Sequence, residues 1–208
     1  MASLYNRFVL PGLLKCACSA RPIMKQRAKV VPDASGRVLE LGIGMGLNLA
    51  FYDPDKVESV TGVDPAAELR AVALAAPRDP RLSVKVEDGT AEALPFEASS
   101  FDCVVCTFTL CSVHTPAKAL SEARRVLRPG GRFLFCEHGL APDAEVTKSQ
   151  RRIEPVWKAI AGGCHLTRPV TTAIAAAGFQ IRRQESRYIP KTPRFAGWIE
   201  WGEASVRP

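Results

Sequence analysis

The stretch RVLELGIGMGLNLAFYD, residues 37–53, decides the fold of this chain. A short run rich in valine and leucine is followed by three glycines, Gly42, Gly44 and Gly46, that alternate with apolar residues. The run predicts a buried strand, and the glycines predict a turn from that strand into a helix. In α/β proteins ligands bind at such carboxyl ends of strands, so the stretch predicts a cofactor site.

Length and composition predict one globular domain. The chain has 208 residues, of which 47% are apolar and 24% are charged. These values are typical of a folded domain with a full core rather than of a disordered chain. No apolar run approaches the roughly 20 residues that a membrane-spanning helix needs.

The cysteines predict a reducing, cytoplasmic location and no metal site. There are seven of them, and they do not repeat at the spacing of metal ligands. Cys103 and Cys106 form a C-x-x-C within an apparent strand, where their odd separation points the two thiols to opposite faces. Both are therefore expected to be small buried hydrophobic residues rather than a redox pair.

A net charge of +7 raises the question of a nucleic-acid or anionic membrane partner. The basic residues do not alternate with aromatic residues in the stripe that stacks bases, so nucleic acid is not expected. We expect them on the solvated surface; they include Arg21, Lys25, Arg27, Arg124, Arg125, Arg151, Arg152, Arg182 and Arg183.

Residues 1–36 are expected to form an N-terminal helical cap. The first acidic residue is Asp33, and Pro11 and Lys15 interrupt the apolar core that a secretory signal needs. Amphipathic helices would bury their apolar side chains, Leu4, Phe8, Leu13 and Leu14, against the domain or a lipid surface. Peripheral membrane contact, a transit peptide and the oligomeric state remain open.

The order of elements predicts an α/β domain over residues 37–208. Strand-like segments 37–41, 57–63, 81–87, 101–110 and 130–137 are interrupted by helix-like segments 46–52, 65–76 and 116–127, with Pro65 at the first helical position. This alternation is typical of a parallel sheet with helices on both faces. Two further helices, 146–163 and 168–179, precede two strands, 179–189 and 195–204, expected to be antiparallel neighbours at the edge of the sheet.

Residues around the glycine turn indicate which cofactor it binds. The turn lacks the lysine of phosphate-binding loops and reads G-x-G-x-G rather than the dinucleotide pattern G-x-G-x-x-G. Glu40 would repel a pyrophosphate but would attract an ammonium or a sulfonium group. Asp64 ends the second strand, 22 residues after Gly42, where an acidic residue accepts hydrogen bonds from ribose hydroxyls. A ribose and an amino-acid group without phosphate indicate S-adenosylmethionine (SAM).

Four motifs in order resemble the class I SAM-dependent methyltransferases: VLELGIGMG, GVDP, AEALPFEASSFDCV and ALSEARRVLRPGGRFLF. The resemblance covers about residues 37–137 and implies a Rossmann-like, seven-stranded, mostly parallel sheet whose last strand is antiparallel. It implies that Glu40 and the three glycines contact the methionine part of SAM, that Asp64 contacts the ribose, and that Thr90, Ala91 and Glu92 contact the adenine. Asn48, Pro65 and Thr107 belong to the same expected site.

One position departs from the family pattern. Many members have an acidic residue where this chain has Thr90, and that residue accepts a hydrogen bond from the adenine amino group. Thr90 or the neighbouring Asp88 is expected to take this role.

A narrower resemblance concerns the substrate. The segments CTFTLCSV (106–113), CEHG (136–139) and EPVWKAIAGGCHLTR (154–168) are similar to the methyltransferase-like thiol S-methyltransferases and their bacterial relatives. We therefore expect a SAM-dependent methyltransferase that acts on a small or amphiphilic, lipid-like molecule, with a thiol as the leading acceptor. The alternatives are a phospholipid or amine N-methyltransferase, a quinone-type C-methyltransferase, and a non-catalytic SAM-binding partner subunit.

Candidate substrate residues follow from the chemistry of a thiol acceptor. A thiol with a pKa of about 8.5 is mostly protonated at neutral pH, so a base or a positive field would assist methyl transfer. His138 follows the fifth strand and is the expected base. The other expected substrate contacts are Cys111, Cys164, His165 and Arg168. The [DN]-P-P-[YF] motif of enzymes that methylate nucleobase amines is absent after the fourth strand.

Overall fold

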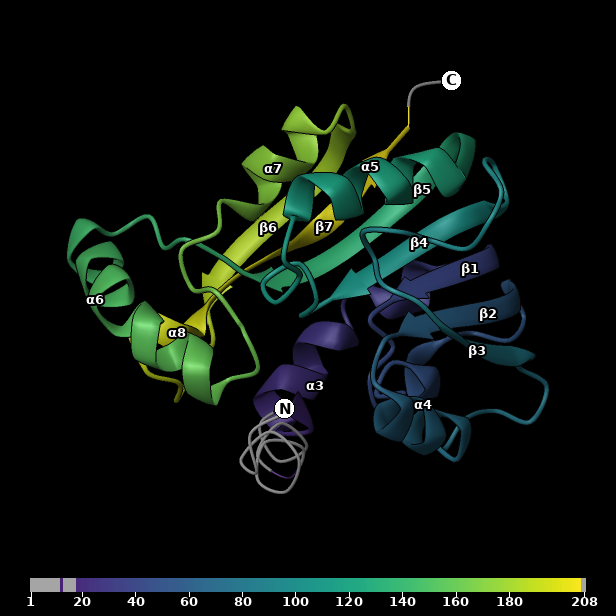
Figure 1. Ribbon diagram of the computed structural model, residues 1–208, viewed down its shortest axis with the longest axis horizontal. Helices are drawn as coiled ribbons and strands as arrows, with labels where there is room; N and C mark the ends of the chain where they lie inside the picture. Colours follow the sequence, from purple (N-terminus) through teal and green to yellow (C-terminus); the bar gives the residue numbers. More distant parts are fainter. Residues whose placement is uncertain (1–11, 13–17, 207–208) are drawn as a thin grey trace.

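The computed structural model describes residue 12 and residues 18–206. Their centre is a seven-stranded sheet in the order β3-β2-β1-β4-β5-β7-β6. The strands are β1 (Gly36–Leu41), β2 (Val57–Asp64), β3 (Val84–Asp88), β4 (Phe101–Thr107), β5 (Leu127–His138), β6 (Gln180–Tyr188) and β7 (Trp198–Ser205). Figure 1 shows the sheet with helices above and below it.

The strand directions confirm the predicted fold class. The pairs β1–β2, β1–β4, β2–β3 and β4–β5 are parallel, whereas β7 is antiparallel to both β5 and β6. The last two strands are the antiparallel neighbours that the sequence predicted. Only β6 lies at the edge, because β7 inserts between β5 and β6.

The helices differ from the predicted segments mainly in length. They are α3 (Arg21–Arg27), α4 (Ala67–Leu74), α5 (Pro116–Val126), α6 (Ala144–Ile160), α7 (Val170–Ala176) and α8 (Arg194–Gly197), with 3₁₀ turns η1 (Val31–Asp33) and η2 (Leu49–Phe51). The expected helix over 46–52 is only η2. The expected first position of α4 was also wrong, because the helix begins two residues after Pro65, with Ala66 as its N-cap.

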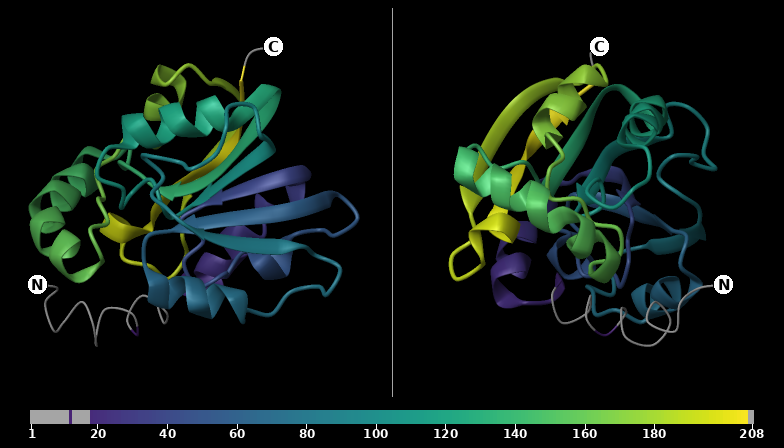
Figure 2. Two further views of the ribbon diagram at one scale, coloured as in Figure 1. Left: turned by 45° about the vertical axis from the view of Figure 1, so that its right-hand side comes forward. Right: turned by 60° about the vertical axis from the view of Figure 1, so that its left-hand side comes forward.

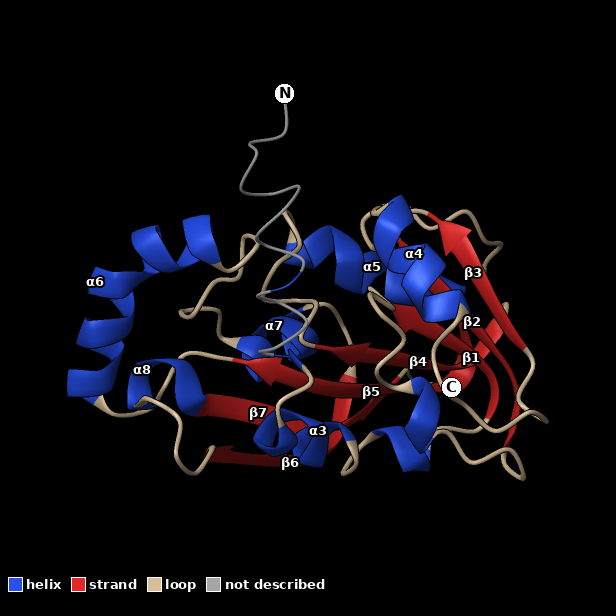
Figure 3. Cartoon of the chain, turned by 90° about the horizontal axis from the view of Figure 1, so that it is seen from below, coloured by secondary structure: helices blue, strands red, loops and turns tan. Residues whose placement is uncertain are grey.

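Two apolar cores lie on the two faces of the sheet. One packs α5 and α7 against the strands through residues such as Leu120 and Ile174. The other packs η1, η2 and α4 through Val31, Leu49 and Ala73. The left view of Figure 2 shows α5 and α7 on the opposite side of the sheet from α4. Figure 3 shows α6 and α8 together at one end of the molecule and β3 at the other. Cys103 and Cys106 are buried in different cores, as their spacing predicted.

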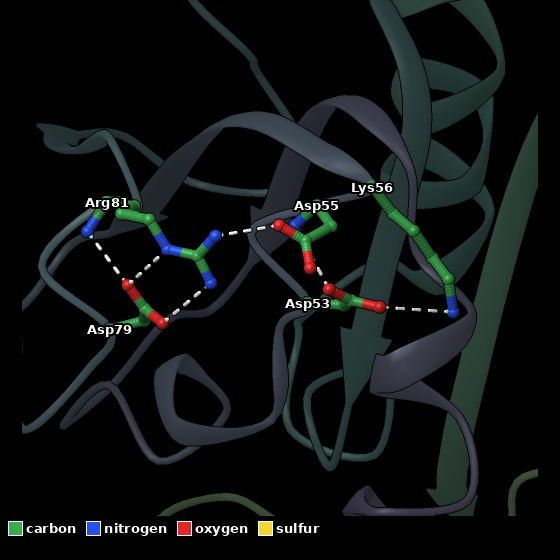
Figure 4. A network of polar contacts seen from close by, with 5 residues as sticks. All are labelled: Asp53, Asp55, Lys56, Asp79 and Arg81. Atoms are coloured by element: carbon green, nitrogen blue, oxygen red, sulfur yellow. Dashed lines mark hydrogen bonds and ion pairs between the residues drawn. The ribbon is translucent and has the colours of Figure 1, made fainter.

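A polar network joins the loops that precede β2 and β3 (Figure 4). Arg81 pairs with Asp55 at 2.7 Å and with Asp79 at 3.2 Å, and Lys56 pairs with Asp53 at 3.3 Å. These charges lie at the amino ends of the strands, opposite to the carboxyl ends where ligands bind in α/β folds. The network therefore belongs to the scaffold and not to the candidate site.

Only part of the expected N-terminal cap is described. Residues 18–36 contain α3 and η1, while the apolar residues that should anchor the cap, Leu4, Phe8, Leu13 and Leu14, lie outside the described residues. In the described part of the chain no helix combines the length and apolar character needed to cross a bilayer.

Candidate functional site

A cavity of about 490 Å³ opens at the carboxyl ends of β1, β2 and β4. Its size is within the range of ligand pockets, roughly 300–1,000 Å³. The turn after β1, the end of β2, the loop after β3 and the segment after β4 contribute to its wall, and α3 adds one side chain, Arg27. The end of α6 closes another side through Ala161 and Gly162. Figure 1 shows α3 and α6 at this edge of the sheet.

The three glycines of the turn have different tasks. All have positive φ, +64° for Gly42, +53° for Gly44 and +74° for Gly46. A Cβ on Gly44 would meet only the Gly42 carbonyl oxygen, at 3.9 Å, so this glycine leaves open cavity beside the backbone. Gly46 does not line the cavity, and its Cβ would lie 2.9 Å from the Ala76 Cβ. Gly46 therefore allows the turn to pack on the α4 side rather than to approach a ligand.

Asp64 lies where the sequence placed it, in the cavity wall at the end of β2. Its Oδ2 accepts a hydrogen bond from the Gly44 N–H at 3.0 Å, and its Oδ1 accepts one from the Ala66 N–H at 2.9 Å. Burial raises the pKa of Asp64, and the two backbone hydrogen bonds oppose that rise. A carboxylate has about four acceptor positions, so both oxygens can still accept from ribose hydroxyls.

The predicted adenine residues also line the cavity. Thr90, Ala91 and Glu92 follow β3 and lie beside Pro65 in the wall. Asp88, the alternative to Thr90, is not among the lining residues and instead pairs with Arg70 at 2.7 Å. The structure therefore favours Thr90 over Asp88 as the residue near the adenine.

Glu40 is buried behind the cavity wall rather than in it. Its carboxylate accepts hydrogen bonds from Asn48 Nδ2 at 2.9 Å and from the Tyr52 hydroxyl at 2.7 Å. Burial raises the pKa of Glu40 to about 7, against the effects of Tyr52 and Arg27. Neither Glu40 nor Asn48 is among the described lining residues, so direct contact with SAM remains a prediction for both.

Arg27 is the main residue that the sequence analysis placed wrongly. It was expected on the solvated surface, but it is 6% exposed and lines the cavity. Its Nη1 donates to Asn48 Oδ1 at 2.9 Å and to Thr107 Oγ1 at 2.6 Å. Its guanidinium lies 5.0 Å from the centre of the Phe108 ring. The sequence carried little signal for this position beyond its place shortly before the first strand.

Phe108 itself was also missed. It follows β4 with a φ of +54°, which is uncommon for a residue other than glycine. This conformation turns the chain out of the sheet and places Phe108 in the cavity wall with Thr107 and Thr109. Backbones held in such sparsely populated regions are frequent at functional sites.

The expected substrate residues lie one layer behind the described lining residues. Cys111 and Cys164 are buried, and the Cys111 carbonyl accepts the His165 N–H at 2.7 Å. The imidazole Nδ1 of His165 contacts Glu154 at 3.1 Å. Arg168 donates to the carbonyl oxygens of Leu110 and Val113. These four residues thus hold the segment after β4 and the α6–α7 connection together; Ser112, Val113 and His114 are in the wall instead.

His138 lies behind Phe108, with the two ring centres 5.1 Å apart. Burial lowers the pKa of His138 to about 4, and its buried Nδ1 has no hydrogen-bond partner among the described residues. Such an imidazole is neutral at neutral pH but is a weak base toward a thiol with a pKa of about 8.5. General-base catalysis by His138 stays a prediction, and this environment weakens it.

Glu137 was not predicted, yet it organises the wall after β4. Its side chain is fully buried, and its carboxylate accepts backbone N–H groups of Thr109 at 2.7 Å, Leu110 at 3.0 Å and Cys111 at 3.2 Å. Burial raises the pKa of Glu137, and these N–H groups oppose the rise. A glutamate next to a histidine at the end of a strand was the available signal.

The cavity has the features that SAM requires. Gly44 leaves space beside the backbone, Asp64 offers acceptors for a ribose, and the segment 90–92 offers a wall for a base. Eight of the eleven predicted cofactor residues line it: Gly42, Gly44, Asp64, Pro65, Thr90, Ala91, Glu92 and Thr107. The residues present therefore fit the cofactor.

Several known proteins are similar in sequence to this chain. Residues 39–135 match the family described as methyltransferase domain. Thiol S-methyltransferase TMT1B of Homo sapiens is 37% identical over 180 residues, which cover 81% of this chain and 73% of that protein. Demethylmenaquinone methyltransferase of Clavibacter sepedonicus is 33% identical over 178 residues, covering 85% of this chain and 69% of that protein.

A solved structure of a methyltransferase has a similar fold. A SAM-dependent methyltransferase from Thermotoga maritima superposes with a TM-score of 0.69 at 21% identity, covering 98% of both chains. At 21% identity this similarity shows the fold alone, whereas the relatives in sequence show the family. Since these relatives exceed 30% identity over more than two thirds of their own length, the chain belongs to the SAM-dependent methyltransferases.

Proposed function

We propose that this SAM-dependent methyltransferase transfers the methyl group to the sulfur of a small or amphiphilic thiol. The observation that carries the proposal is the 37% identity to a thiol S-methyltransferase over 180 residues, compared with 33% over 178 residues for the demethylmenaquinone methyltransferase. Both matches extend beyond the domain matched at residues 39–135. The shared region thus includes chain outside the cofactor-binding half, where class I methyltransferases differ according to their acceptors.

The chemistry of the cavity supports a thiol. SAM supplies an electrophilic methyl group when bound, and the acceptor must present a lone pair. Among the described lining residues the histidine is the exposed His114, and the carboxylates of Asp64 and Glu92 already accept backbone N–H groups. Such a wall offers little general-base assistance. A thiol needs the least, because a few per cent is already thiolate at pH 7.

The surroundings of the cavity suit an acceptor with an apolar portion. The last turn of α6 leads into Ala161 and Gly162 of the wall, which also includes the apolar side chains of Phe108 and Val113. An alkyl or aryl group could rest on this side while its sulfur enters the cavity. We therefore expect apolar thiols to be better acceptors than charged ones.

Transfer of radiolabel from SAM to a panel of acceptors tests the proposal. The panel contains alkyl and aryl thiols, matched amines and phenols, phosphatidylethanolamine vesicles and a demethylmenaquinone analogue, with the Gly44→Val variant as the background control. Label on thiols, with the other classes at background, is expected. Label confined to amines, phospholipid or quinone would assign one of the other two transferase types. SAM binding without any transfer would favour a non-catalytic partner subunit.

A further inference from the structure

Arg27 has a buried positive charge without a counter-charge at contact distance. The side chain is 6% exposed, and no ion pair within 4.0 Å joins it to another described residue. Its Nε is also buried without a hydrogen-bond partner in the described part of the chain. An unpaired buried charge is strongly unfavourable, so a protein that keeps one in a cavity wall has a site for an anion.

The guanidinium is fixed in the cavity wall near the end of β4. Its Nη1 donates to Asn48 and Thr107, and the guanidinium packs against the Phe108 ring. Thr107 and Phe108 belong to the end of β4, whereas Asp64 ends β2, two strands away in the sheet. Asp64 would hold the ribose of a bound cofactor, and Arg27 lies two strands away, on the side of the cavity left for the methionine end and the acceptor.

A thiol of the protein already lies within the field of Arg27. Cys18 lines the same cavity. Burial raises the pKa of Cys18, and the charge of Arg27 opposes that rise. Sulfur in this part of the cavity is therefore close enough for its ionisation to depend on Arg27.

We propose that Arg27 is the residue that selects and ionises the thiol acceptor, by binding its sulfur as the thiolate. The inference rests on the proposed thiol specificity. The thiol gives its proton to solvent on binding, and the thiolate lone pair forms the new bond to the methyl carbon. The bond from that carbon to the sulfonium sulfur breaks with its electron pair, which leaves S-adenosylhomocysteine and a neutral methyl thioether. The thioether has no charge for Arg27 to hold, which favours its release.

Other titratable groups lie near Arg27, and their ionisation must be distinguished from that of the acceptor. Those whose ionisation depends on its charge come from the N-terminal segment, β1, the end of η2 and β5: Cys18, Glu40, Tyr52, Cys136 and His138. Lys25 lies on the same helix but is exposed. The Glu40→Gln variant, titrated in parallel, shows how much of any pH dependence near 7 comes from that carboxyl group.

The test measures the ionisation of a bound thiol without turnover. Thiophenol is titrated on the intact protein in complex with S-adenosylhomocysteine, because the thiolate absorbs in the ultraviolet and this complex has no sulfonium charge. In wild type the pKa of bound thiophenol should lie at least about one pH unit below its value in water, a tenfold gain in thiolate at lower pH. In Arg27→Gln it should return to or above the value in water. Arg27→Lys should keep part of the effect, and the charge control Lys25→Gln all of it.

Turnover gives the second readout. At saturating thiol the pH midpoint of kcat should move upward in Arg27→Gln, while the midpoint of kcat/KM, set by the free thiol, stays in place. At neutral pH kcat should fall about tenfold, and at high pH it should reach or exceed wild type, since a free thiolate is the stronger nucleophile. If Arg27→Gln does not fold, the wild-type titration still decides, because an unshifted bound thiol would overturn the proposal.

A carboxylate of the cofactor is the competing occupant of this site. If Arg27→Gln weakens SAM binding tenfold or more in calorimetry and leaves the pKa of the bound thiol as it is in wild type, Arg27 holds the cofactor and the inference is wrong. Failure of every thiol as an acceptor would instead contradict the proposed function. If thiols are methylated but the thiol bound to wild type has the same pKa as in water, only the role of Arg27 is contradicted.

Discussion

At the scale of single residues, Gly44 and Gly46 of the turn after β1 have different roles. A Cβ at Gly44 would enter open cavity, whereas a Cβ at Gly46 would press on Leu49 at 3.0 Å and on the α4 side. Gly44→Ala should therefore lower stability by only about 1 kcal/mol, from its positive φ, but weaken SAM binding tenfold or more. Gly46→Ala should lower stability by roughly 2–4 kcal/mol, because strain and overpacking add.

Urea unfolding and calorimetry with SAM on both variants separate these effects. Equal loss of SAM affinity in the two folded variants would show that the cavity assignment of Gly44 is wrong.

Glu40 should make the stability of the protein depend on pH. Its folded pKa of about 7 lies above the ordinary value of 4.5, so the fold favours the protonated carboxyl group. This contribution is complete below pH 4.5 and is lost as the pH rises through 7. Glu40→Gln mimics the protonated form. The variant should match wild type near pH 4.5 and exceed it by roughly 1–3 kcal/mol at pH 8.

Thermal or urea unfolding of wild type and Glu40→Gln from pH 4.5 to pH 8 supplies the measurement. A difference that stays constant from pH 4.5 to pH 8 would mean that Glu40 is ionised in the fold throughout.

At the scale of elements, β5 shapes the cavity through the loop after β4. Glu137 accepts three consecutive backbone N–H groups of that loop. Glu137→Gln replaces one acceptor oxygen with a donor, so at least one buried N–H loses its partner and meets another donor. We expect a loss of roughly 2–4 kcal/mol in stability and a clear fall in kcat/KM for the acceptor.

A comparison substitution, Glu122→Gln, changes a carboxylate on α5 that accepts one backbone N–H, from Leu94 at 2.9 Å, and pairs with Arg125 at 2.7 Å. It should cost less stability and leave the acceptor kinetics near wild type. Similar kinetic losses in the two variants would argue against a role for Glu137 in positioning the loop.

At the scale of the whole molecule, the cofactor should stabilise the fold by joining the ends of several strands. A ligand that binds only the folded state at about 100 times its Kd contributes roughly 2.7 kcal/mol. For a chain of this size that corresponds to a rise in Tm of about 5–10 °C. SAM should produce this rise, and NAD should not, because the turn has the pattern G-x-G-x-G and lacks the G-x-G-x-x-G pattern of dinucleotide sites.

Differential scanning fluorimetry with both compounds, and with Gly44→Val as the control, checks this expectation. A rise with NAD as large as that with SAM would contradict the assignment of the turn.

Local patterns were sufficient for the strands and for the glycine turn and Asp64 of the cofactor wall, whereas Thr90, Ala91 and Glu92 were predicted from the family resemblance. Apolar runs interrupted by turn residues indicate strands because strand formation and burial depend on neighbours in sequence. The turn at Gly42 and Gly44 and the acidic end of β2 at Asp64 are likewise local signals. For the same reason the sequence predicted the antiparallel pairing of β6 and β7 but not the insertion of β7 beside β5, which depends on long-range contacts.

Only the tertiary structure decided which polar side chains reach the cavity wall. Arg27 resembles any surface arginine in sequence, and it lies in the cavity because α3 folds back onto Asn48 and Thr107, 21 and 80 residues away. Cys111, His138 and Arg168 are in the predicted segments, but packing turned them behind the wall. A sequence specifies which residues a strand end carries; the packing of distant elements specifies which of them contact the ligand.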